Sequence, residues 1–207
     1  EKELSQSRIS IMLSQIQPHF LYISLVGIKQ LCETDPQRAS DALEHFSYYL
    51  RGNLDSLSNT GLIPFEKELD HIEDYLYLEK MRYGERLRIR WEIGYQDFML
   101  PPLTLQPIVE NAVRYGITQK KAGGSLTIRS GQADGSVVIT VVDDGVGFDI
   151  SEKKEDGRTH IGLENVRDRL DAMCGGRLEV KSEIGTGTEI KLILPQRRNR
   201  VNENYSG

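Results

Sequence analysis

Apolar residues recur at steps of three and four along the first stretch of the chain, which predicts an amphipathic helix running to about Cys32. Asp35 suits the N-cap of a second helix and Pro36 its first position, and that helix should stop near Gly52. The pattern therefore predicts a helical hairpin with an apolar stripe on each arm. Pairing with a second copy into a four-helix bundle would bury both stripes, and an internal docking site on the later domain is the alternative. The first stripe comprises Ile9, Leu13, Ile16, Phe20 and Ile23.

Pro18 interrupts the first of these helices. A proline inside a helix removes a backbone donor and presses against the carbonyl four residues earlier, so the helix should bend where His19 is presented. The alternative is that Pro18 ends the helix and that His19 is an ordinary surface residue.

A polar segment follows the hairpin, and after it the apolar residues again recur at helical spacing. Residues 53–63 are rich in Asn, Ser and Gly and are interpreted as a linker. A third helix is predicted from about Pro64 to Tyr83, ended by Gly84, with its charged residues forming a solvated face. From Leu87 the apolar residues alternate with charged ones, which predicts a half-buried strand.

The second half of the chain mixes strands and helices in no regular order. Helical spacing is found from Leu103 to Tyr115. Strands are expected at residues 125–130, 136–142, 177–183 and 189–194, a polar loop at 145–159 and a helix at 162–173. This order predicts the α+β class, with a mixed sheet covered on one face by helices.

The composition is that of a soluble globular protein of 207 residues with a net charge of −5, which gives little electrostatic support for nucleic-acid binding. Cys32 and Cys174 lie far apart and outside any CxxC motif, which argues against a zinc site and favours a reducing compartment. No apolar run reaches the roughly 18 residues that cross a bilayer. The chain starts without methionine and in helical register, so we expect an upstream part to be missing.

Two stretches of the second half carry residue types suited to nucleotide binding. Asn111 and Arg114 are one turn apart on the same face of a predicted helix. An amide oxygen suits Mg²⁺, which keeps several phosphate oxygens as ligands, and the arginine could contact those phosphates. Asp143 ends an apolar strand and is followed by Gly145 and Gly147, where backbone can approach a ligand closely. A buried carboxylate there is well placed to accept the exocyclic amine of adenine.

A third stretch, from His160 to Leu163, opens a helix after a polar loop, and the N-terminus of a helix favours phosphate. Each of these signals alone also fits a simpler structure, such as a turn for DxGxG or a surface helix for Asn111. None is a P-loop or a dinucleotide fingerprint, because no Gly-Lys-Ser or Gly-Lys-Thr follows the glycines. The case for a nucleotide site therefore rests on their order and spacing.

The same stretches resemble the sequence boxes of a known superfamily. The N, G1, G2 and G3 boxes of the GHKL ATPases look like ENAVRYG, DDGVGF, HIGLENVRDRL and GTGTEIKLILP of this chain. One branch, the LytS/YesM-type sensor histidine kinases, is similar also in LSQIQPHFLY, EKELDHIEDYLYLEKMRYGERL and PPLTLQPIVENA. The resemblance covers nearly the whole chain. It implies an α/β sandwich of the GHKL type after the helical hairpin, and a protein-histidine kinase that uses ATP and Mg²⁺.

The resemblance also implies roles for individual residues. His19 would be the phosphoacceptor, Asn111 the Mg²⁺ ligand and Asp143 the residue that reads adenine. Three glycines would shape the pocket, and a threonine would lie near the adenine. The ATP-binding residues expected are Asn111, Arg114, Tyr115, Asp143, Gly145, Gly147, Gly162, Leu163 and Thr188.

Partners, location and domain boundaries follow from the same resemblance. The partners would be a second copy of the chain and the receiver domain of a response regulator, with no nucleic acid. The chain would be the cytoplasmic portion of a bacterial inner-membrane sensor, reaching the membrane only through an absent upstream segment. Residues 1–60 would hold the dimerisation and phosphotransfer helices, 61–84 a connecting helix, 85–197 the catalytic ATP-binding domain and 198–207 a tail.

The chain departs from the pattern of this branch at two positions. The branch usually has asparagine four residues after the histidine, where this chain has Ile23. An apolar neighbour favours the neutral imidazole but cannot form a hydrogen bond. A nucleotide-binding regulatory module or pseudokinase with impaired phosphotransfer is therefore an alternative function, and an ATPase that drives a clamp is another, disfavoured by the PHFLY stretch. Tyr115 stands where the branch often has histidine, as an aromatic residue does in other histidine kinases.

Overall fold

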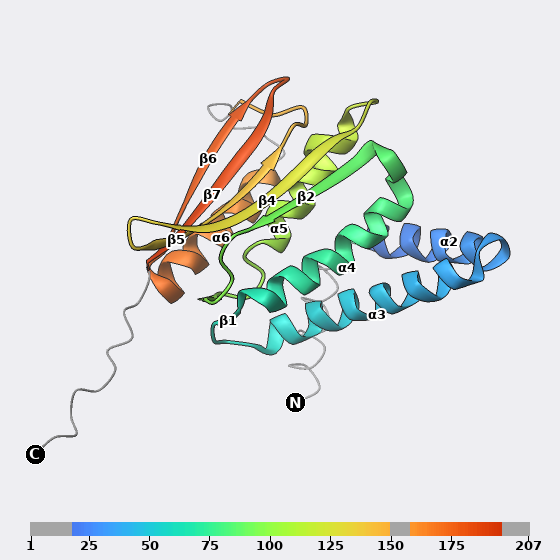
Figure 1. Ribbon diagram of the computed structural model, residues 1–207, viewed down its shortest axis with the longest axis horizontal. Coiled ribbons are helices and arrows are strands. Elements are labelled where there is room, and N and C mark those ends of the chain that lie inside the picture. Colours follow the sequence, from blue (N-terminus) through green and yellow to red (C-terminus); the bar gives the residue numbers. More distant parts are fainter. Residues whose placement is uncertain (1–17, 150–157, 196–207) are drawn as a thin grey trace, which may run out of the picture.

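The computed structural model describes residues 18–149 and 158–195, and shows a helical hairpin beside a five-stranded mixed sheet (Figure 1). The strand order is β2-β4-β5-β7-β6, in which β2 is parallel to β4 and every other pair is antiparallel. The sheet strands are β2 (Leu87–Ile93), β4 (Gly124–Ala133), β5 (Ser136–Asp143), β6 (Arg177–Glu183) and β7 (Gly187–Pro195). The predicted α+β class with a mixed sheet is confirmed.

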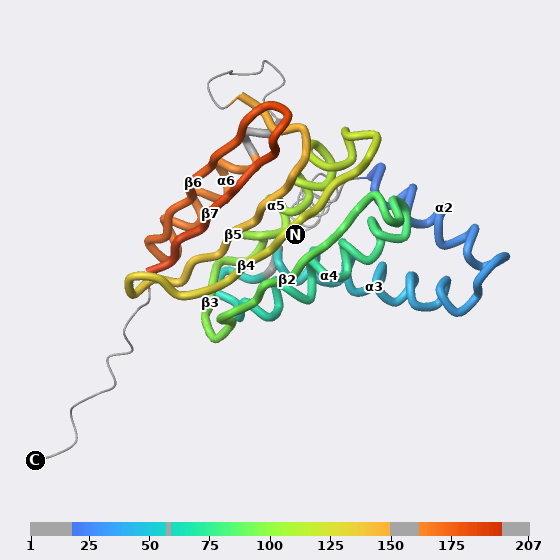
Figure 2. Tube along the Cα trace, turned by 45° about the horizontal axis from the view of Figure 1, so that its top comes forward, coloured from blue at the N-terminus to red at the C-terminus, as the bar shows by residue number. Residues whose placement is uncertain are grey.

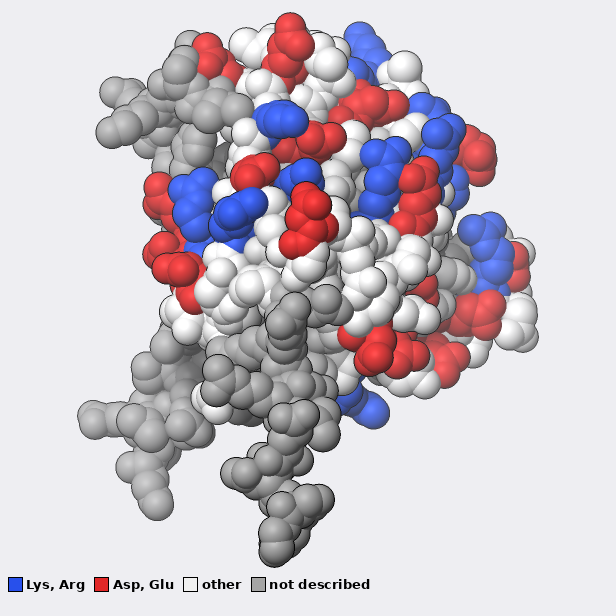
Figure 3. Space-filling model, turned by 60° about the vertical axis from the view of Figure 1, so that its left-hand side comes forward, with Lys and Arg blue, Asp and Glu red and all other residues white. Residues whose placement is uncertain are grey.

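Helices cover one face of this sheet. In β5 every second residue is buried, including Val137, Ile139 and Val141, whereas the residues between them are partly exposed. Helices α5 (Gln106–Asn111) and α6 (Arg158–Cys174) lie behind the sheet, as Figure 2 shows. This alternation is typical of a sheet with one packed and one solvated face. The solvated side carries Lys, Arg, Asp and Glu side chains intermixed (Figure 3).

The predicted hairpin is present and is packed against a third helix of the same chain. The hairpin consists of α2 (Pro18–Thr34) and α3 (Pro36–Ser58), and the carboxylate of Asp35 accepts a hydrogen bond from the backbone N–H of Arg38, as expected of an N-cap. The ring of Phe20 lies 5.0 Å from that of Tyr49 on α3 and 5.2 Å from that of Tyr75 on α4 (Phe65–Tyr83). Within one chain, therefore, the hairpin docks on the later part of the molecule, which is the alternative left open by the sequence. Dimerisation stays a prediction.

Helix α3 does not stop at Gly52 but continues to Ser58, so the predicted end is wrong and the linker is much shorter than residues 53–63. Gly52 lies inside the helix at a point where α3 packs closely against α4 and leaves no space for a side chain. A Cβ atom built on Gly52 would lie 2.1 Å from Nδ1 of His71 on α4. The glycine therefore lets two helices approach rather than ending one of them. The chain then enters the short strand β1 (Ile63–Pro64), which pairs with β3 (Met99–Leu100).

Helix α4 is correctly predicted in extent, and Gly84 ends it with a φ of 57°. Its charged residues do not all form a solvated face: Glu68, His71 and Glu79 are buried. The physical reason is the position of α4, which contacts the hairpin on one side and α5 with its preceding turn on the other (Figure 1). None of the described helices is long and apolar enough to span a membrane.

The helix predicted from Leu103 to Tyr115 begins later and changes its winding. Regular α-helix covers Gln106–Asn111, followed by the π-helical η2 (Ala112–Gly116) and the 3₁₀ turn η3 (Ile117–Gln119). Another 3₁₀ turn, η1 (Gly84–Arg86), follows α4. Helix α6 starts before the predicted Gly162, at Arg158.

Candidate functional site

The site centres on Asp143 at the end of β5. The side chain is 5% exposed, and its Oδ1 accepts a hydrogen bond of 2.8 Å from the backbone N–H of Gly145. Burial raises the pKa of Asp143 to about 6, against the lowering effect of that hydrogen bond. Near neutral pH the group is therefore a buried carboxylate with remaining acceptor capacity.

Glycines surround this carboxylate and keep side chains away from it. A Cβ atom on Gly116 would lie 2.6 Å from Oδ1 of Asp143, and one on Gly145 would lie 2.5 Å from the same oxygen. A Cβ on Gly187 would lie 2.0 Å from the backbone oxygen of Asp143. A side chain at any of these three positions would collide with Asp143, so backbone approaches its carboxylate at Gly116 and Gly145 and its backbone oxygen at Gly187.

The predicted G1 and G3 stretches meet at this point. Thr188 lies directly opposite Asp143 in the β5–β7 register. The hydroxyl of Thr188 lies 3.0 Å from that of Ser182 on β6. Gly147 has a φ of +60°, and a Cβ there would lie 2.0 Å from the backbone oxygen of Glu183. The DDGVGF loop is therefore fitted closely against the turn that precedes β7.

Asn111 brings the N stretch beside the start of α6. It is half-buried at the end of α5, and a Cβ atom on Gly162 would lie 3.7 Å from its Nδ2. Leu163 is 6% exposed and belongs to the hydrophobic core. The predicted positions Asn111 and Gly162, distant in sequence, are thus neighbours in space.

Arg114 and Tyr115 lie on η2 and are exposed. The guanidinium carbon of Arg114 stands 5.0 Å from the centre of the Tyr115 ring, a cation–π arrangement. The prediction that Asn111 and Arg114 share one helical face is weakened, because the wider π-helical turn rotates Arg114 farther from Asn111 than an α-helix would. Such π-helical segments are frequent at functional sites.

The residues present fit a magnesium nucleotide. Asp143 is a buried carboxylate acceptor with glycine backbone close to it, which is the chemistry that the exocyclic amine of adenine requires. Among the residues that the structure describes, no group of three or more His, Cys, Asp or Glu could hold a metal ion. A single amide such as Asn111 suits a cation held mainly by phosphate oxygens.

The predicted loop over the nucleotide falls largely on residues 150–157, outside the described residues, as does the side chain of His160.

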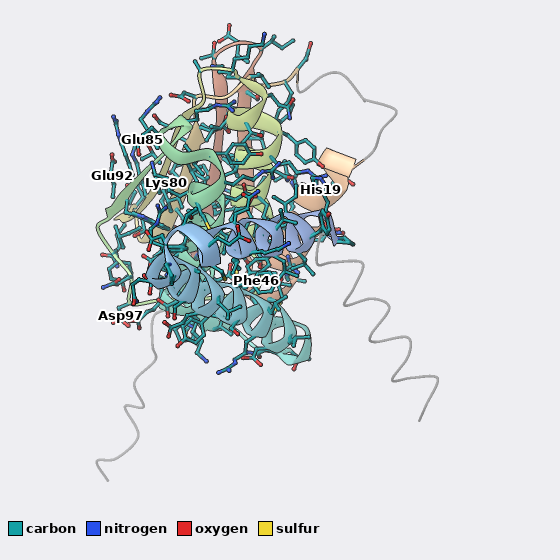
Figure 4. All side chains as sticks on the ribbon, turned by 90° about the vertical axis from the view of Figure 1, so that its right-hand side faces the viewer. His19, Phe46, Lys80, Glu85, Glu92 and Asp97 are labelled. Atoms are coloured by element: carbon teal, nitrogen blue, oxygen red, sulfur yellow. The ribbon has the colours of Figure 1, made fainter. Side chains whose placement is uncertain are left out.

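His19 is exposed in the first described turn of α2 (Figure 4). Pro18 and His19 are the first two residues of α2 and are both helical. The alternative that Pro18 ends an earlier helix concerns residues outside the described part of the chain and stays a prediction. The predicted bend involves residues before Pro18, which lie outside the described part of the chain. Ile23, one turn after His19, is half-buried and lines a cavity of about 650 Å³ between α2 and α4.

The sequence reasoning missed several residues at this site. Gly116 ends the ENAVRYG stretch, but no local pattern indicates its contact with Asp143, which is distant in the sequence. Glu68 accepts backbone hydrogen bonds from Leu103, Thr104 and Leu105, and so holds the turn that leads into α5. No local pattern distinguishes Glu68 from the exposed acids of α4.

Two family models match the chain: "Histidine kinase" over residues 7–87, and "Histidine kinase-, DNA gyrase B-, and HSP90-like ATPase" over residues 102–198. The protein YwpD of Bacillus subtilis is 35% identical over 199 residues, which are 93% of this chain and 71% of YwpD. The sensor protein LytS of Bacillus anthracis is 31% identical over 208 residues, which are 95% of this chain. The chain spans only 35% of the length of that LytS.

A solved structure of similar fold is the histidine kinase domain of the blue-light activated histidine kinase from Erythrobacter litoralis. The likeness covers 92% of this chain and 91% of that domain, with a TM-score of 0.52 and 16% identity, and it concerns the fold alone. The two family matches and the relatives establish that the chain belongs to the histidine kinases, in the branch that includes the LytS sensor proteins.

Proposed function

We propose that the chain phosphorylates His19 with ATP and passes the phosphoryl group to an aspartate in the receiver domain of a response regulator. The observation that carries this proposal is the buried Asp143 carboxylate, with the backbone of Gly116 and Gly145 close to its Oδ1. An exposed histidine on a separate helix supplies the acceptor group. Phosphoryl transfer asks the protein mainly for positioning and charge neutralisation, so few residues are needed.

Each residue near the cradle has a role in this proposal. Asp143 accepts the exocyclic amine of adenine, and Thr188 lies opposite it on β7. Asn111 holds Mg²⁺ through its amide oxygen, and Arg114, stacked on Tyr115, contacts phosphate. ATP supplies the γ-phosphoryl group when bound. A ring nitrogen of His19 forms the new bond to phosphorus, while the bond from phosphorus to the leaving ADP oxygen breaks.

The hairpin supports a second part of the proposal, a homodimer. Large apolar side chains remain exposed on α2 and α3, including Tyr22 at 69%, Leu25 at 49% and Leu43 at 52%. Exposed apolar residues grouped on one structural unit are typical of an interaction surface. In this arrangement residues 1–60 carry the acceptor, 61–84 connect, and 85–197 bind ATP. The chain would be the cytoplasmic part of a membrane sensor, joined to it through an upstream segment.

The test of the kinase function is incubation of the chain with Mg²⁺ and γ-labelled ATP. We expect label that is lost in acid, stable in alkali, and absent from His19→Ala and Asn111→Ala. His45→Ala, which removes another histidine of the hairpin, is the matched control and should keep its label. Acid-stable label, or label retained by His19→Ala, would contradict the proposal.

A second candidate function rests on Ile23, which is apolar and lines the cavity beside the acceptor helix. Without a hydrogen-bonding side chain one turn from His19, the chain would bind nucleotide without efficient transfer. The variant Ile23→Asn separates the two functions. If only Ile23→Asn becomes labelled, the chain is a regulatory module, whereas equal labelling of both proteins supports the kinase.

A further inference from the structure

Helix α5 lies between the hairpin and the nucleotide residues. Gln106 and Glu110 are one turn apart on the side that contacts α3 and α4. Asn111, the next residue, lies instead beside Gly162 of α6. Because consecutive helical residues point in different directions, one short helix presents Glu110 to the hairpin and Asn111 to the nucleotide site.

A buried hydrogen-bond network fixes the orientation of Gln106. Its Nε2 donates to Oε1 of Glu110 at 2.7 Å and to Oδ1 of Asn53 at 3.2 Å. Its Oε1 lies 2.6 Å from Nε2 of His71, which must be the donor because a carbonyl oxygen only accepts. Burial lowers the pKa of His71 and so favours the neutral ring with its proton on Nε2. The network therefore ties α3, α4 and α5 together with defined donors.

Tyr49 extends this network to the acceptor helix. Its side chain is 1% exposed, and its hydroxyl donates to Oε1 of Glu110 at 3.3 Å. Its ring packs against Phe20, which follows His19 in the chain, and stacks on His71 at 5.3 Å. Burial raises the pKa of Tyr49, so the hydroxyl remains a neutral donor. Contacts thus run from the residue after the proposed phosphoacceptor to the residue before the proposed metal ligand.

We propose that Glu110 is a positioning residue of the kinase site: through its hydrogen bond from Tyr49, it couples the docked hairpin to the orientation of Asn111. The inference rests on the proposed function, since Asn111 is the Mg²⁺ ligand only within it. Glu110 is half-buried, and without the Tyr49 donor its Oε1 still accepts from Gln106, so the loss removes the direct tie between α3 and Glu110 and lets α5 shift relative to the hairpin. A shift of α5 moves Asn111 directly, whereas it reaches the Asp143 carboxylate only through Gly116 of η2, because Asp143 itself ends β5 and Gly187 begins β7.

The variant Tyr49→Phe tests this coupling, because it removes the hydroxyl and keeps the ring that packs on Phe20. ATP affinity is measured by calorimetry on the full chain, once with Mg²⁺ and once with EDTA. We expect the affinity with Mg²⁺ to fall about fivefold, the value of one net hydrogen bond, and the affinity in EDTA to be unchanged. An equal loss in both conditions indicates general structural damage and overturns the proposal, as does no loss in either.

Two further sets of variants serve as controls. Tyr48→Phe removes the neighbouring hydroxyl, which is bonded to Glu44 on the surface of α3, and should leave both affinities unchanged. Glu110→Gln keeps an acceptor oxygen and should retain most of the Mg²⁺-dependent affinity, whereas Glu110→Ala should lose at least as much as Tyr49→Phe. Equal behaviour of the Gln and Ala variants would contradict the acceptor role of Glu110.

Asn111→Ala distinguishes failure of this inference from failure of the proposed function. It should remove the Mg²⁺ dependence, and adding Tyr49→Phe should then have no further effect, since both changes act on the same interaction. If the unmodified chain binds no ATP in either condition, both the function and the inference fail. If it binds with a Mg²⁺ dependence that Asn111→Ala removes and Tyr49→Phe leaves intact, only the coupling fails.

Discussion

Glu68 and Asp143 are both buried carboxyl groups, 2% and 5% exposed, but their surroundings differ. Glu68 accepts three backbone hydrogen bonds, of 2.6, 3.0 and 2.9 Å, from Leu103, Thr104 and Leu105. Asp143 accepts one backbone hydrogen bond, from Gly145, interacts with the side chain of Thr188, and has the backbone of Gly116 close to its Oδ1. A carboxylate occupied by the protein's own donors holds the fold, whereas one surrounded by glycine backbone retains capacity for a ligand.

Burial raises the pKa of both groups, and the opposing effects differ. For Glu68, backbone hydrogen bonds and the charge of Arg169 lower it again. Arg169 also donates to the backbone oxygen of Leu103 at 2.7 Å, so it supports the same turn. From this comparison we expect the Glu68 cluster to stabilise the fold, and the Asp143 cradle to serve in the ligand binding that we propose.

The largest expected effect is that of Glu68→Ala on stability. It leaves three backbone donors without their acceptor and removes the carboxylate near Arg169, so the free energy of unfolding should fall by about 3 to 5 kcal/mol. Denaturant unfolding measures this change. Glu66→Ala, at an exposed acid of the same helix, should change it by less than about 0.5 kcal/mol. Similar losses in the two variants would remove the distinction drawn for Glu68.

Gly116→Ala should act on the other side of the comparison, on binding rather than folding. The added Cβ would lie 2.6 Å from Oδ1 of Asp143 and displace the carboxylate. We expect ATP affinity to fall about 100-fold, equivalent to about 2.8 kcal/mol, measured by calorimetry. Gly131→Ala on β4 is the matched control, because a Cβ there meets nothing within 4 Å. An unchanged affinity in Gly116→Ala would show that the cradle does not hold nucleotide.

The smallest effect expected is a pH dependence of adenosine binding. With a pKa of about 6, Asp143 is ionised at pH 7.5 and becomes protonated as the pH falls through 6, which removes the charged acceptor for the adenine amine. Affinity for adenosine, which has no phosphate to titrate, should therefore fall about tenfold between pH 7.5 and pH 5. Equilibrium dialysis measures it. Asp143→Asn should flatten the profile, and a profile unaffected by that change would assign the titration elsewhere.

The sequence predicted the elements whose signals are local. The hairpin followed from helical spacing with an Asp35–Pro36 start, and the sheet strands from alternation between turns. The order of the four boxes predicted which stretches would meet, and Asn111 does lie beside Gly162, as Asp143 lies opposite Thr188.

The features that were missed depend on contacts between distant elements. Gly52 resembles a helix stop, and only the position of His71 explains why α3 continues through it. Glu68 and Glu79 resemble surface acids until α4 is placed between two neighbours. The π-helical winding of η2 has no local sequence signal, so the relation between Asn111 and Arg114 could not be predicted accurately.

The most direct test of the account is a crystal structure of the chain with Mg²⁺ and a non-hydrolysable ATP analogue. The account predicts the adenine amine within hydrogen-bond distance of the Asp143 carboxylate, with Mg²⁺ bound to the amide oxygen of Asn111. A nucleotide bound elsewhere, or one in the cradle whose adenine does not contact Asp143, would contradict it.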